Sequence, residues 1–478
     1  MSSVIILVAD GARPDTLERA LADGALPAMA RLRAEGGLHT VTSTFPSVTG
    51  PAYAPFVMGR FPGPIGLPGL RWYDRARTRR TFPDRTRSYV GAELRHVDGD
   101  LDPAAPTLFE LAGSGGGRSL AALNVIGRGL RPREVVARSV LWALRAARTH
   151  FCGDVGGWLA IDRDVGVALA RRVRVTRPAV TFAAFTGVDK TSHSDGHDAP
   201  LVRDALCIVD ETAALLRADA EREGRWDETH LWIVSDHGHS PVREHEDLAE
   251  LVASWGHRVL AHPWVYRVRR PDVAVMVSGN AMAHLYLEPA RRDRPWWPAL
   301  GPAHGALVDR LLERPSVDLA LLPHSPSRCE VRGRGRGGAL VELTTSDAGR
   351  ARYSYRPLDG DPLDVGASFH AVSSADAYAA TRDGDYPDAV VQIAHLAGAA
   401  RSGEVILSAS RDWDFRCRYE PIPHLSSHGA LHREHMLVPL LLNRPPARSP
   451  MRTTDVMPSA LRALGLTVPD GLDGESFV

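Results

Sequence analysis

Acidic and imidazole side chains follow apolar segments at four places in the chain. Asp10 follows the run Val4–Ala9, and the pair Asp236 and His237 follows Leu231–Val234. The third place holds Asp189 and His193, and the fourth holds His428. A mixed set of carboxylates and imidazoles suits Zn²⁺, with Mn²⁺ or iron as alternatives, whereas oxygen-only sites favour Mg²⁺ or Ca²⁺. These residue types therefore predict metal chemistry.

Three aspartates and three histidines are too many ligands for one tetrahedral ion. They suit two divalent ions roughly 4 Å apart, a spacing at which a pair of ions holds the attacking and leaving oxygens of a phosphoryl group. Taken alone, the triplet Asp236-His237-Gly238 is more typical of a solvated turn. The prediction of a two-metal site therefore depends on all four stretches together.

Such a site needs a nucleophile, and Thr49 is the candidate. It stands in the turn region 45–51, where a tight turn opens a helix. A metal ion bound to its hydroxyl would lower the pKa of that group, and the substrate would meet the helix N-terminus. The alternative is that Thr49 only caps the helix.

Alternating strands and helices are expected to position these residues. The predicted strands are Val4–Ala9, Leu38–Thr44, Leu120–Val125, Val180–Thr186 and Leu231–Val234. The predicted helices follow Asp15 and span Ala52–Met58, Leu101–Leu111, Glu134–Ala147, Asp162–Arg174 and Ala199–Glu221. This order predicts an α/β fold with a doubly wound, mostly parallel sheet flanked by helices. Ligands bind such folds at the carboxyl ends of the strands.

The pattern changes between residues 268 and 361, where short strands surround a single helix at Ala303–Glu313. We predict an inserted α+β cap domain at 268–361 and a catalytic core formed by 1–267 and 362–478. Short strands are expected again at Val390–Ile393 and Glu404–Ser408. The Arg/Gly tract 332–338 is short and lacks interleaved aromatic residues, so a turn is favoured over an RNA contact.

The composition narrows the classes of partner. The 478 residues are 44% hydrophobic and 24% charged with a formal net charge of +0, so the overall charge favours neither nucleic acid nor an anionic membrane. The cysteines Cys152, Cys207, Cys329 and Cys417 are scattered, which argues against disulfides and thiolate zinc sites. The N-terminus lacks the pattern of a signal peptide, and a cytoplasmic location is expected.

Five stretches, taken in order, resemble the type I phosphodiesterase/nucleotide pyrophosphatase family of the alkaline phosphatase superfamily. They are Val8–Asp15, Pro46–Gly63, Asp189–His197, Val234–His239 and Ser427–Gly429. The resemblance covers about residues 1–265 and 365–478. It implies a metal-dependent hydrolase with a doubly wound α/β core.

The resemblance also implies roles for the residues. Thr49 would be the nucleophile that is transiently phosphorylated. One zinc ion would be held by Asp189, His193 and His428, and the other by Asp10, Asp236, His237 and the Thr49 hydroxyl. Thr44 competes with Thr49, because Thr-Phe-Pro is a common form of the family motif. Spacing favours Thr49, which lies ten residues before Gly59, whereas Thr44 lies fifteen before it.

The remaining histidines near these motifs have no matched role. They are His197, His239, His245, His424, His432 and His435, which we expect at the surface or behind the metal ligands. The sequence also departs from the family pattern after Gly63. Ile65-Gly66 stands where the family has His-Gly, and the asparagine that would contact phosphate falls at about Leu70.

The predicted substrate contacts are Arg71, Trp72 and Tyr73, with Phe61 as a further aromatic candidate. An aromatic wall suits the second organic group of a phosphodiester. An inward-pointing Arg71 would instead clamp the dianion of a monoester. If Arg71 instead faces solvent or pairs with Asp74, the expected preference for diesters is unchanged.

We therefore expect a hydrolase that cleaves phosphodiesters or nucleotide pyrophosphates at two divalent ions, most simply Zn²⁺ with Mn²⁺ as the alternative. A phosphomonoesterase, a phosphotransferase or a catalytically silent metal-binding protein are the alternatives. The expected partner is a small phosphate ester, with no nucleic acid and no membrane. The oligomeric state is left open.

Overall fold

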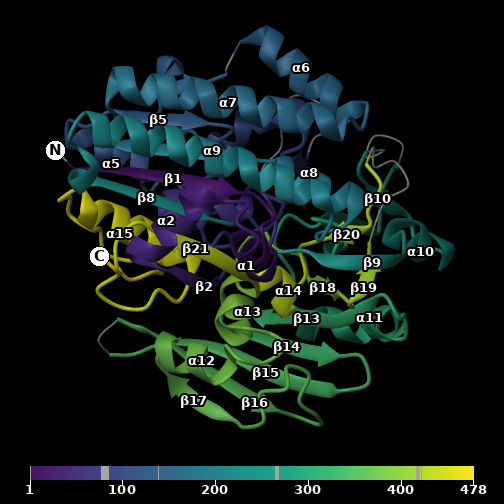
Figure 1. The fold of residues 1–478 in the computed structure, drawn as a ribbon. Coiled ribbons are helices and arrows are strands. Elements are labelled where there is room, and N and C mark those ends of the chain that lie inside the picture. Colours follow the sequence, from purple (N-terminus) through teal and green to yellow (C-terminus); the bar gives the residue numbers. More distant parts are fainter. Residues whose placement is uncertain are drawn as a thin grey trace.

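The fold was examined in a computed structural model that describes residues 2–76, 85–137, 139–263, 268–347, 349–415, 420 and 422–478. Cys417 lies outside this part of the chain, and Cys152, Cys207 and Cys329 are free thiols. Two large sheets dominate the molecule, one above the other in Figure 1. No helix of the described part is long and apolar enough to span a bilayer.

The first sheet has seven strands in the order β2-β21-β8-β1-β7-β5-β6. Their bounds are β1 Ser3–Ala9, β2 Leu38–Thr42, β5 Ser119–Ala122, β6 Val135–Val136, β7 Val180–Phe185, β8 Thr229–Val234 and β21 Leu437–Leu442. β21 runs antiparallel to both of its neighbours, and the other pairs are parallel. The central strands are mostly apolar because both faces of the sheet are covered.

Helices cover both faces of this sheet (Figure 1). Alternate residues of β1 point to opposite sides, so Ile5 and Leu7 belong to one core and Val4 and Ile6 to the other. The first core contains α1 Pro14–Ala22, α2 Pro27–Gly36, α7 Val155–Thr176 and α9 Pro200–Arg222. The second contains α3 Ala54–Met58, α5 Leu108–Ser114 and α15 Val456–Ala463. The predicted doubly wound fold is confirmed.

The second sheet has nine strands in the order β10-β11-β12-β18-β13-β14-β15-β16-β17. Their bounds are β10 Val259–Ala261, β11 Val273–Ser278, β12 Met282–Leu287, β13 Val317–Ser325, β14 Arg328–Gly333, β15 Gly337–Thr345, β16 Ala351–Pro357, β17 Phe369–Val372 and β18 Val405–Ala409. Helix α11 (Trp297–Leu312) packs on one face, and α12 (Ser374–Thr381) and α13 (Ala389–Ala397) pack on the other. Three of the strands, β10, β17 and β18, come from outside residues 268–361.

Smaller elements connect the two sheets. A three-stranded sheet has the order β19-β9-β20, with β9 Ser240–His245, β19 Asp412–Asp414 and β20 Ser426–Ser427. A hairpin pairs β3 (Arg71–Tyr73) with β4 (Thr86–Ser88). The remaining helices are α4 Val97–Asp100, α6 Val140–Phe151, α8 Gly187–Asp195, α10 Leu248–Ser254 and α14 Arg433–Met436.

Three predicted elements were wrong in type or extent. The helix predicted at Glu134–Ala147 begins only at Val140, after the short strand β6. Val390–Ile393, predicted as a strand, lies in helix α13. Nearly all side chains of this helix are buried. Its sequence therefore lacks the polar face that distinguishes a helix from a strand. The helix predicted at Leu101–Leu111 begins only at Leu108, where Thr107 and Glu110 form a capping box. The preceding residues include two prolines, which disfavour a helix.

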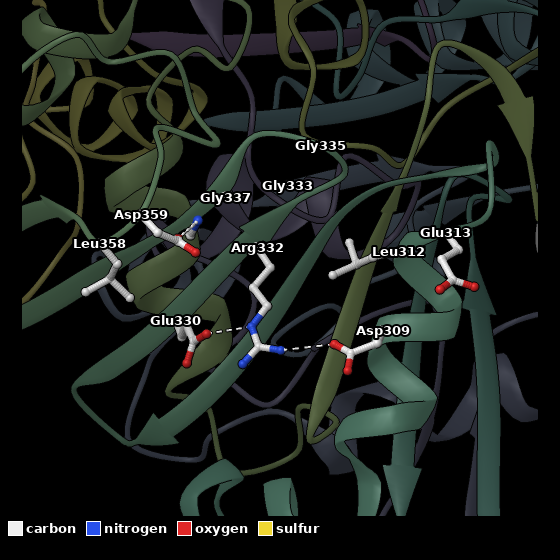
Figure 2. Close-up of a pocket in the computed structure, with 11 residues that line it drawn as sticks. Asp309, Leu312, Glu313, Glu330, Arg332, Gly333, Gly335, Gly337, Leu358 and Asp359 are labelled. Carbon is white, nitrogen blue, oxygen red and sulfur yellow. Dashed lines mark hydrogen bonds and ion pairs between the residues drawn. The ribbon is translucent and has the colours of Figure 1, made fainter.

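A surface cavity of about 480 Å³ lies beside α11 and the turn that joins β14 to β15 (Figure 2). This turn is the Arg/Gly tract. The Arg332 guanidinium pairs with Glu330 at 2.6 Å and Asp309 at 3.5 Å, so the polar groups at its centre satisfy one another. None of the predicted metal ligands lines this cavity.

Candidate active site

Three neighbouring strands deliver the three predicted aspartates to one edge of the first sheet. β1 pairs in parallel with both β7 and β8, so the carboxyl ends of the three strands lie together. Asp10 follows β1 directly, Asp236 follows β8, and Asp189 lies in the first turn of α8 after β7. All three carboxylates are buried. The topology thus concentrates negative charge at the place where open α/β sheets bind ligands.

The first group of ligands, here the Asp10 set, consists of Asp10, Asp236 and His237 together with the Thr49 hydroxyl. Nε2 of His237 lies 3.3 Å from Oδ1 of Asp10 and 3.4 Å from Oδ2 of Asp236. Oγ1 of Thr49 lies 3.2 Å from Oδ1 of Asp10 and 3.1 Å from Nε2 of His237. Four potential ligand atoms therefore face a common point.

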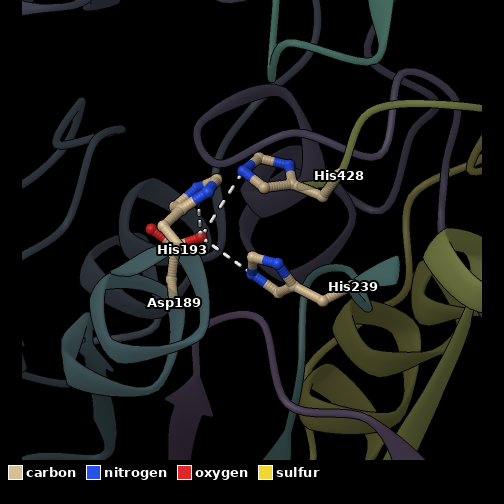
Figure 3. Close-up of side chains that lie close together, drawn as sticks. All are labelled: Asp189, His193, His239 and His428. Carbon is tan, nitrogen blue, oxygen red and sulfur yellow. Dashed lines mark hydrogen bonds and ion pairs between the residues drawn. The ribbon is translucent and has the colours of Figure 1, made fainter. Parts of the chain in front are cut away.

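The second group, here the Asp189 set, consists of Asp189, His193, His239 and His428. Figure 3 shows the three imidazole rings converging on one oxygen of Asp189. Nε2 lies 3.2 Å from Oδ1 of Asp189 in His193, 3.1 Å in His239 and 3.4 Å in His428. His193 reaches this oxygen because it stands one helical turn after Asp189 in α8.

The closest separations in both sets match those between the ligands of a tetrahedral metal ion. Ligand atoms about 2.0–2.1 Å from a tetrahedral ion stand about 3.3–3.4 Å from one another. The separations of 3.1–3.4 Å within the two sets agree with that value. In addition, the buried Oδ2 of Asp236 has no hydrogen-bond partner. A cation between the ligands would satisfy this atom, so the residues fit divalent metal ions.

The electrostatics of the cluster favour cations. Burial raises the pKa of Asp236 well above its usual value, and the nearby Asp10 carboxylate raises it further. Burial also raises the pKa of Asp189, but Lys190 and His193 outweigh it and bring that pKa well below its usual value. Lys190 donates to Oδ2 of Asp189 at 2.7 Å. Metal ions would relieve the repulsion among these carboxylates.

Thr49 faces the Asp10 set and is not a helix cap. The following short helix, Pro51–Tyr53, begins after Gly50, and no side chain caps it. The Thr49 hydroxyl instead donates to Asp10, whose other oxygen accepts a 2.6 Å hydrogen bond from Tyr53. Thr44, the competing candidate, is fully buried, its hydroxyl has no hydrogen-bond partner, and it belongs to neither set.

The aromatic residues predicted to contact substrate are core residues. Trp72 is fully buried and packs edge-on against Tyr89 at 4.9 Å between ring centroids. Tyr73 is 8% exposed, and its hydroxyl donates to the carbonyl of Pro289. Phe61 stacks on His395. The three rings are therefore packed in the interior and do not form an open wall beside the metal ligands.

Arg71 neither faces solvent nor pairs with Asp74. Its side chain is only 12% exposed, and Nη1 lies 3.6 Å from Oε1 of Glu420. Asp74 instead pairs with Arg401 at 3.2 Å. Burial raises the pKa of Glu420, but Arg71, followed by His424 and His193, brings it below its usual value. Arg71 and Glu420 therefore lie on the side of the molecule that carries the metal ligands.

His239 is the ligand-type residue that sequence reasoning missed. It is fully buried in the Asp189 set, although it was expected at the surface or behind the ligands. The available signal was its position two residues after His237, since residues two apart in extended chain point to the same side. His424 also lies close, stacked 4.5 Å from His193, but it belongs to neither set.

Comparisons with known proteins agree with this architecture. The sequence model of the type I phosphodiesterase/nucleotide pyrophosphatase family matches residues 4–294. No curated protein matches the chain significantly in sequence. Phosphonoacetate hydrolase from Sinorhizobium meliloti 1021, in complex with phosphonoformate, superposes with a TM-score of 0.58 at 16% identity, covering 97% of this chain and 96% of that chain.

Ectonucleotide pyrophosphatase/phosphodiesterase 5 has the same fold in two species. An inactive murine variant in complex with AMP gives a TM-score of 0.59 at 14% identity, covering 98% of this chain and 96% of that chain. The human protein gives 0.57 at 14% identity, covering 99% and 97%. The fold is alkaline phosphatase-like. The family model matches more than half of this chain. The chain therefore belongs to the type I phosphodiesterase/nucleotide pyrophosphatase family of phosphoric ester hydrolases.

Proposed function

We propose that this protein hydrolyses phosphodiesters at a two-metal centre and that Thr49 is its nucleophile. The observation that carries the proposal is the position of the Thr49 hydroxyl. It stands 3.2 Å from Asp10 and 3.1 Å from His237, where it completes the Asp10 set. The inactive form of the murine relative carries a threonine-to-alanine substitution, which supports an essential threonine in this family.

Two ions would be held by the two sets of ligands. Asp10, Asp236 and His237 would hold one, and Asp189, His193 and His428 would hold the other. Zn²⁺ suits this mixture of imidazole and carboxylate, and Mn²⁺ is the alternative. When bound, the ions would neutralise charge on the phosphoryl group and lower the pKa of the Thr49 hydroxyl.

The residues of the Asp10 set orient the nucleophile. Tyr53 holds one oxygen of Asp10, which leaves the other to accept the proton of the Thr49 hydroxyl. Attack by Oγ1 of Thr49 forms an oxygen–phosphorus bond and breaks the bond to the leaving alcohol. Water then cleaves the phospho-threonine, releasing the phosphate product and restoring the hydroxyl.

Arg71 supports a diester as the substrate. A monoester dianion would need a free guanidinium to bind its additional charged oxygen. Arg71 already faces the Glu420 carboxylate, so a monoester dianion would have to displace that partner. A diester carries a single charge, which the two ions would balance. Nucleotide pyrophosphates share the diester-like phosphoryl group and fall in the same class.

Comparing kcat/KM for bis-nitrophenyl phosphate and nitrophenyl phosphate, with added Zn²⁺ or Mn²⁺, tests the proposal. The diester should be preferred, and Arg71→Ala should leave that preference in place. Thr49→Ala should abolish turnover while the protein keeps its fold and most of its metal, and Thr44→Ala should be much milder. A monoester preference that collapses in Arg71→Ala would refute the diesterase assignment. Reversed results for the two threonines would refute the choice of nucleophile.

A further inference from the structure

The Asp189 set contains one histidine more than the family resemblance implies. His239 comes from the loop between β8 and β9, and its side chain is completely buried. Its Nε2 is 3.1 Å from Oδ1 of Asp189, as close as the corresponding atoms of His193 and His428. In distance and direction, His239 is therefore equivalent to the two histidines assigned to the ion (Figure 3).

Hydrogen bonds at the far side of each ring determine which nitrogen carries the proton. Nδ1 of His193 is 2.8 Å from the carbonyl of Ser426, and Nδ1 of His428 is 3.0 Å from the carbonyl of Ser47. A carbonyl only accepts, so the proton lies on Nδ1 in both rings. Their Nε2 atoms consequently present bare lone pairs to Asp189.

The same reasoning applies to His239 through a serine hydroxyl. Nδ1 of His239 is 3.2 Å from Oγ of Ser426, and that hydroxyl donates its single proton to the carbonyl of Ser240 at 2.9 Å. Oγ of Ser426 must therefore accept from Nδ1 of His239, which leaves Nε2 without a proton. A bare Nε2 cannot donate to Asp189, so a hydrogen bond does not explain their 3.1 Å approach.

Three nitrogen lone pairs thus lie close to one carboxylate oxygen, an arrangement that a bound cation would stabilise. We propose that His239 is a fourth protein ligand of the ion in the Asp189 set, an inference that rests on the two-metal centre proposed above. Lys190 occupies Oδ2 of Asp189 and leaves Oδ1 as the single carboxylate ligand. Three imidazoles and one carboxylate would then hold the ion.

The two ions consequently differ in how firmly they are held. With His239, the Asp189 set supplies four protein ligands, and its nitrogen-rich composition favours Zn²⁺. The Asp10 set has two carboxylates and one imidazole, and its fourth corner is the Thr49 hydroxyl that does the chemistry. Such an oxygen-rich set accepts harder ions such as Mn²⁺. The ion in the Asp189 set is the one that survives mild chelation.

Stepwise dialysis of the full-length protein against a chelator, followed by metal analysis, tests this difference. Wild type should lose one of two ions early and retain the second. His239→Gln should lose both together, with affinity for the second ion weakened more than about 100-fold. Glutamine keeps a hydrogen-bond donor near Asp189, so it would preserve a purely hydrogen-bonding role. His424→Gln is the matched control, because His424 stacks on His193 outside the set and should leave retention unchanged.

Ser426→Ala provides a second variant that does not alter any ligand. It removes the hydroxyl that orients His239, whereas the Ser426 backbone carbonyl that orients His193 remains. The affinity for the retained ion should fall about 10–100-fold, and the affinity for the ion that is lost first should not change. In Co²⁺-substituted protein, His239→Gln should also alter the visible absorption of the retained ion.

The possible outcomes separate this inference from the proposed function. If wild type holds two ions, and both variants match it in retention, affinity and Co²⁺ spectrum, His239 is not a ligand, although the two-metal centre stands. If wild type holds no transition metal, both proposals fail. If His239→Gln does not fold, the Ser426→Ala result alone decides the matter.

Discussion

Replacing Gly11 by alanine tests how closely the end of β1 packs against the metal ligands. Gly11 has a φ of +81°, and its amide donates to Asp236 at 3.2 Å. An added Cβ would lie 2.8 Å from Nε2 of His239 and 3.1 Å from Cα of Asp189. The first contact would displace the His239 ring. The second would press on the backbone of Asp189, which cannot rotate away as a side chain can.

Two terms set the size of the expected loss in stability. A left-handed conformation costs a residue with a Cβ about 1–2 kcal/mol. Overpacking a rigid interior adds about 1–3 kcal/mol. Gly11→Ala should therefore lower the free energy of unfolding by about 2–5 kcal/mol, measured by urea denaturation of chelator-treated protein. Untreated protein should in addition lose the ion of the Asp189 set.

Gly24→Ala is the matched control. Gly24 has a similar φ of +72°, but no atom lies within 4 Å of the position of its Cβ. Both substitutions change the unfolded chain in the same way and carry the same backbone strain. The difference between them isolates the clash, about 1–3 kcal/mol. If Gly11→Ala destabilises the protein no more than Gly24→Ala, the close packing inferred at the end of β1 is wrong.

Three further predictions concern the Asp10 set. Asp236→Ala should leave one ion per chain instead of two, and an unchanged metal content would exclude Asp236 as a ligand. Tyr53→Phe removes the hydrogen bond to Asp10 and should weaken the ion of that set about 10–100-fold in a metal titration, while the Asp189 set keeps its ion. In metal-free protein, burial lowers the pKa of His237, but Asp236 and Asp10 outweigh it and raise that pKa to about 9 from 6.5. This stabilisation, about 3 kcal/mol, is complete below pH 6.5 and is lost as the pH rises through about 9. Urea unfolding at about pH 6 and about pH 10 should therefore differ in wild type and much less in His237→Gln.

Local sequence was sufficient for the central strands of the first sheet and for the residues that follow them. Val4–Ala9 and Leu231–Val234 are continuous apolar runs that end in an acidic residue or a turn, and such runs form strands buried on both faces. Because parallel strands open on one edge, the approximate place of Asp10, Asp189 and Asp236 followed from the order of elements.

Tertiary packing decided the direction of individual side chains. His239 enters the Asp189 set because Ser426, nearly two hundred residues later in the chain, accepts from its ring. Trp72 looked like a loop aromatic, but it is buried where the β3–β4 hairpin meets the core. A residue's neighbours along the chain constrain its backbone conformation, whereas the rotamer and the partner of its side chain depend on segments that only the folded chain brings near. For this reason the sequence predicted a metal centre at the sheet edge with Thr49 beside it, and only the tertiary structure placed His239 in the Asp189 set.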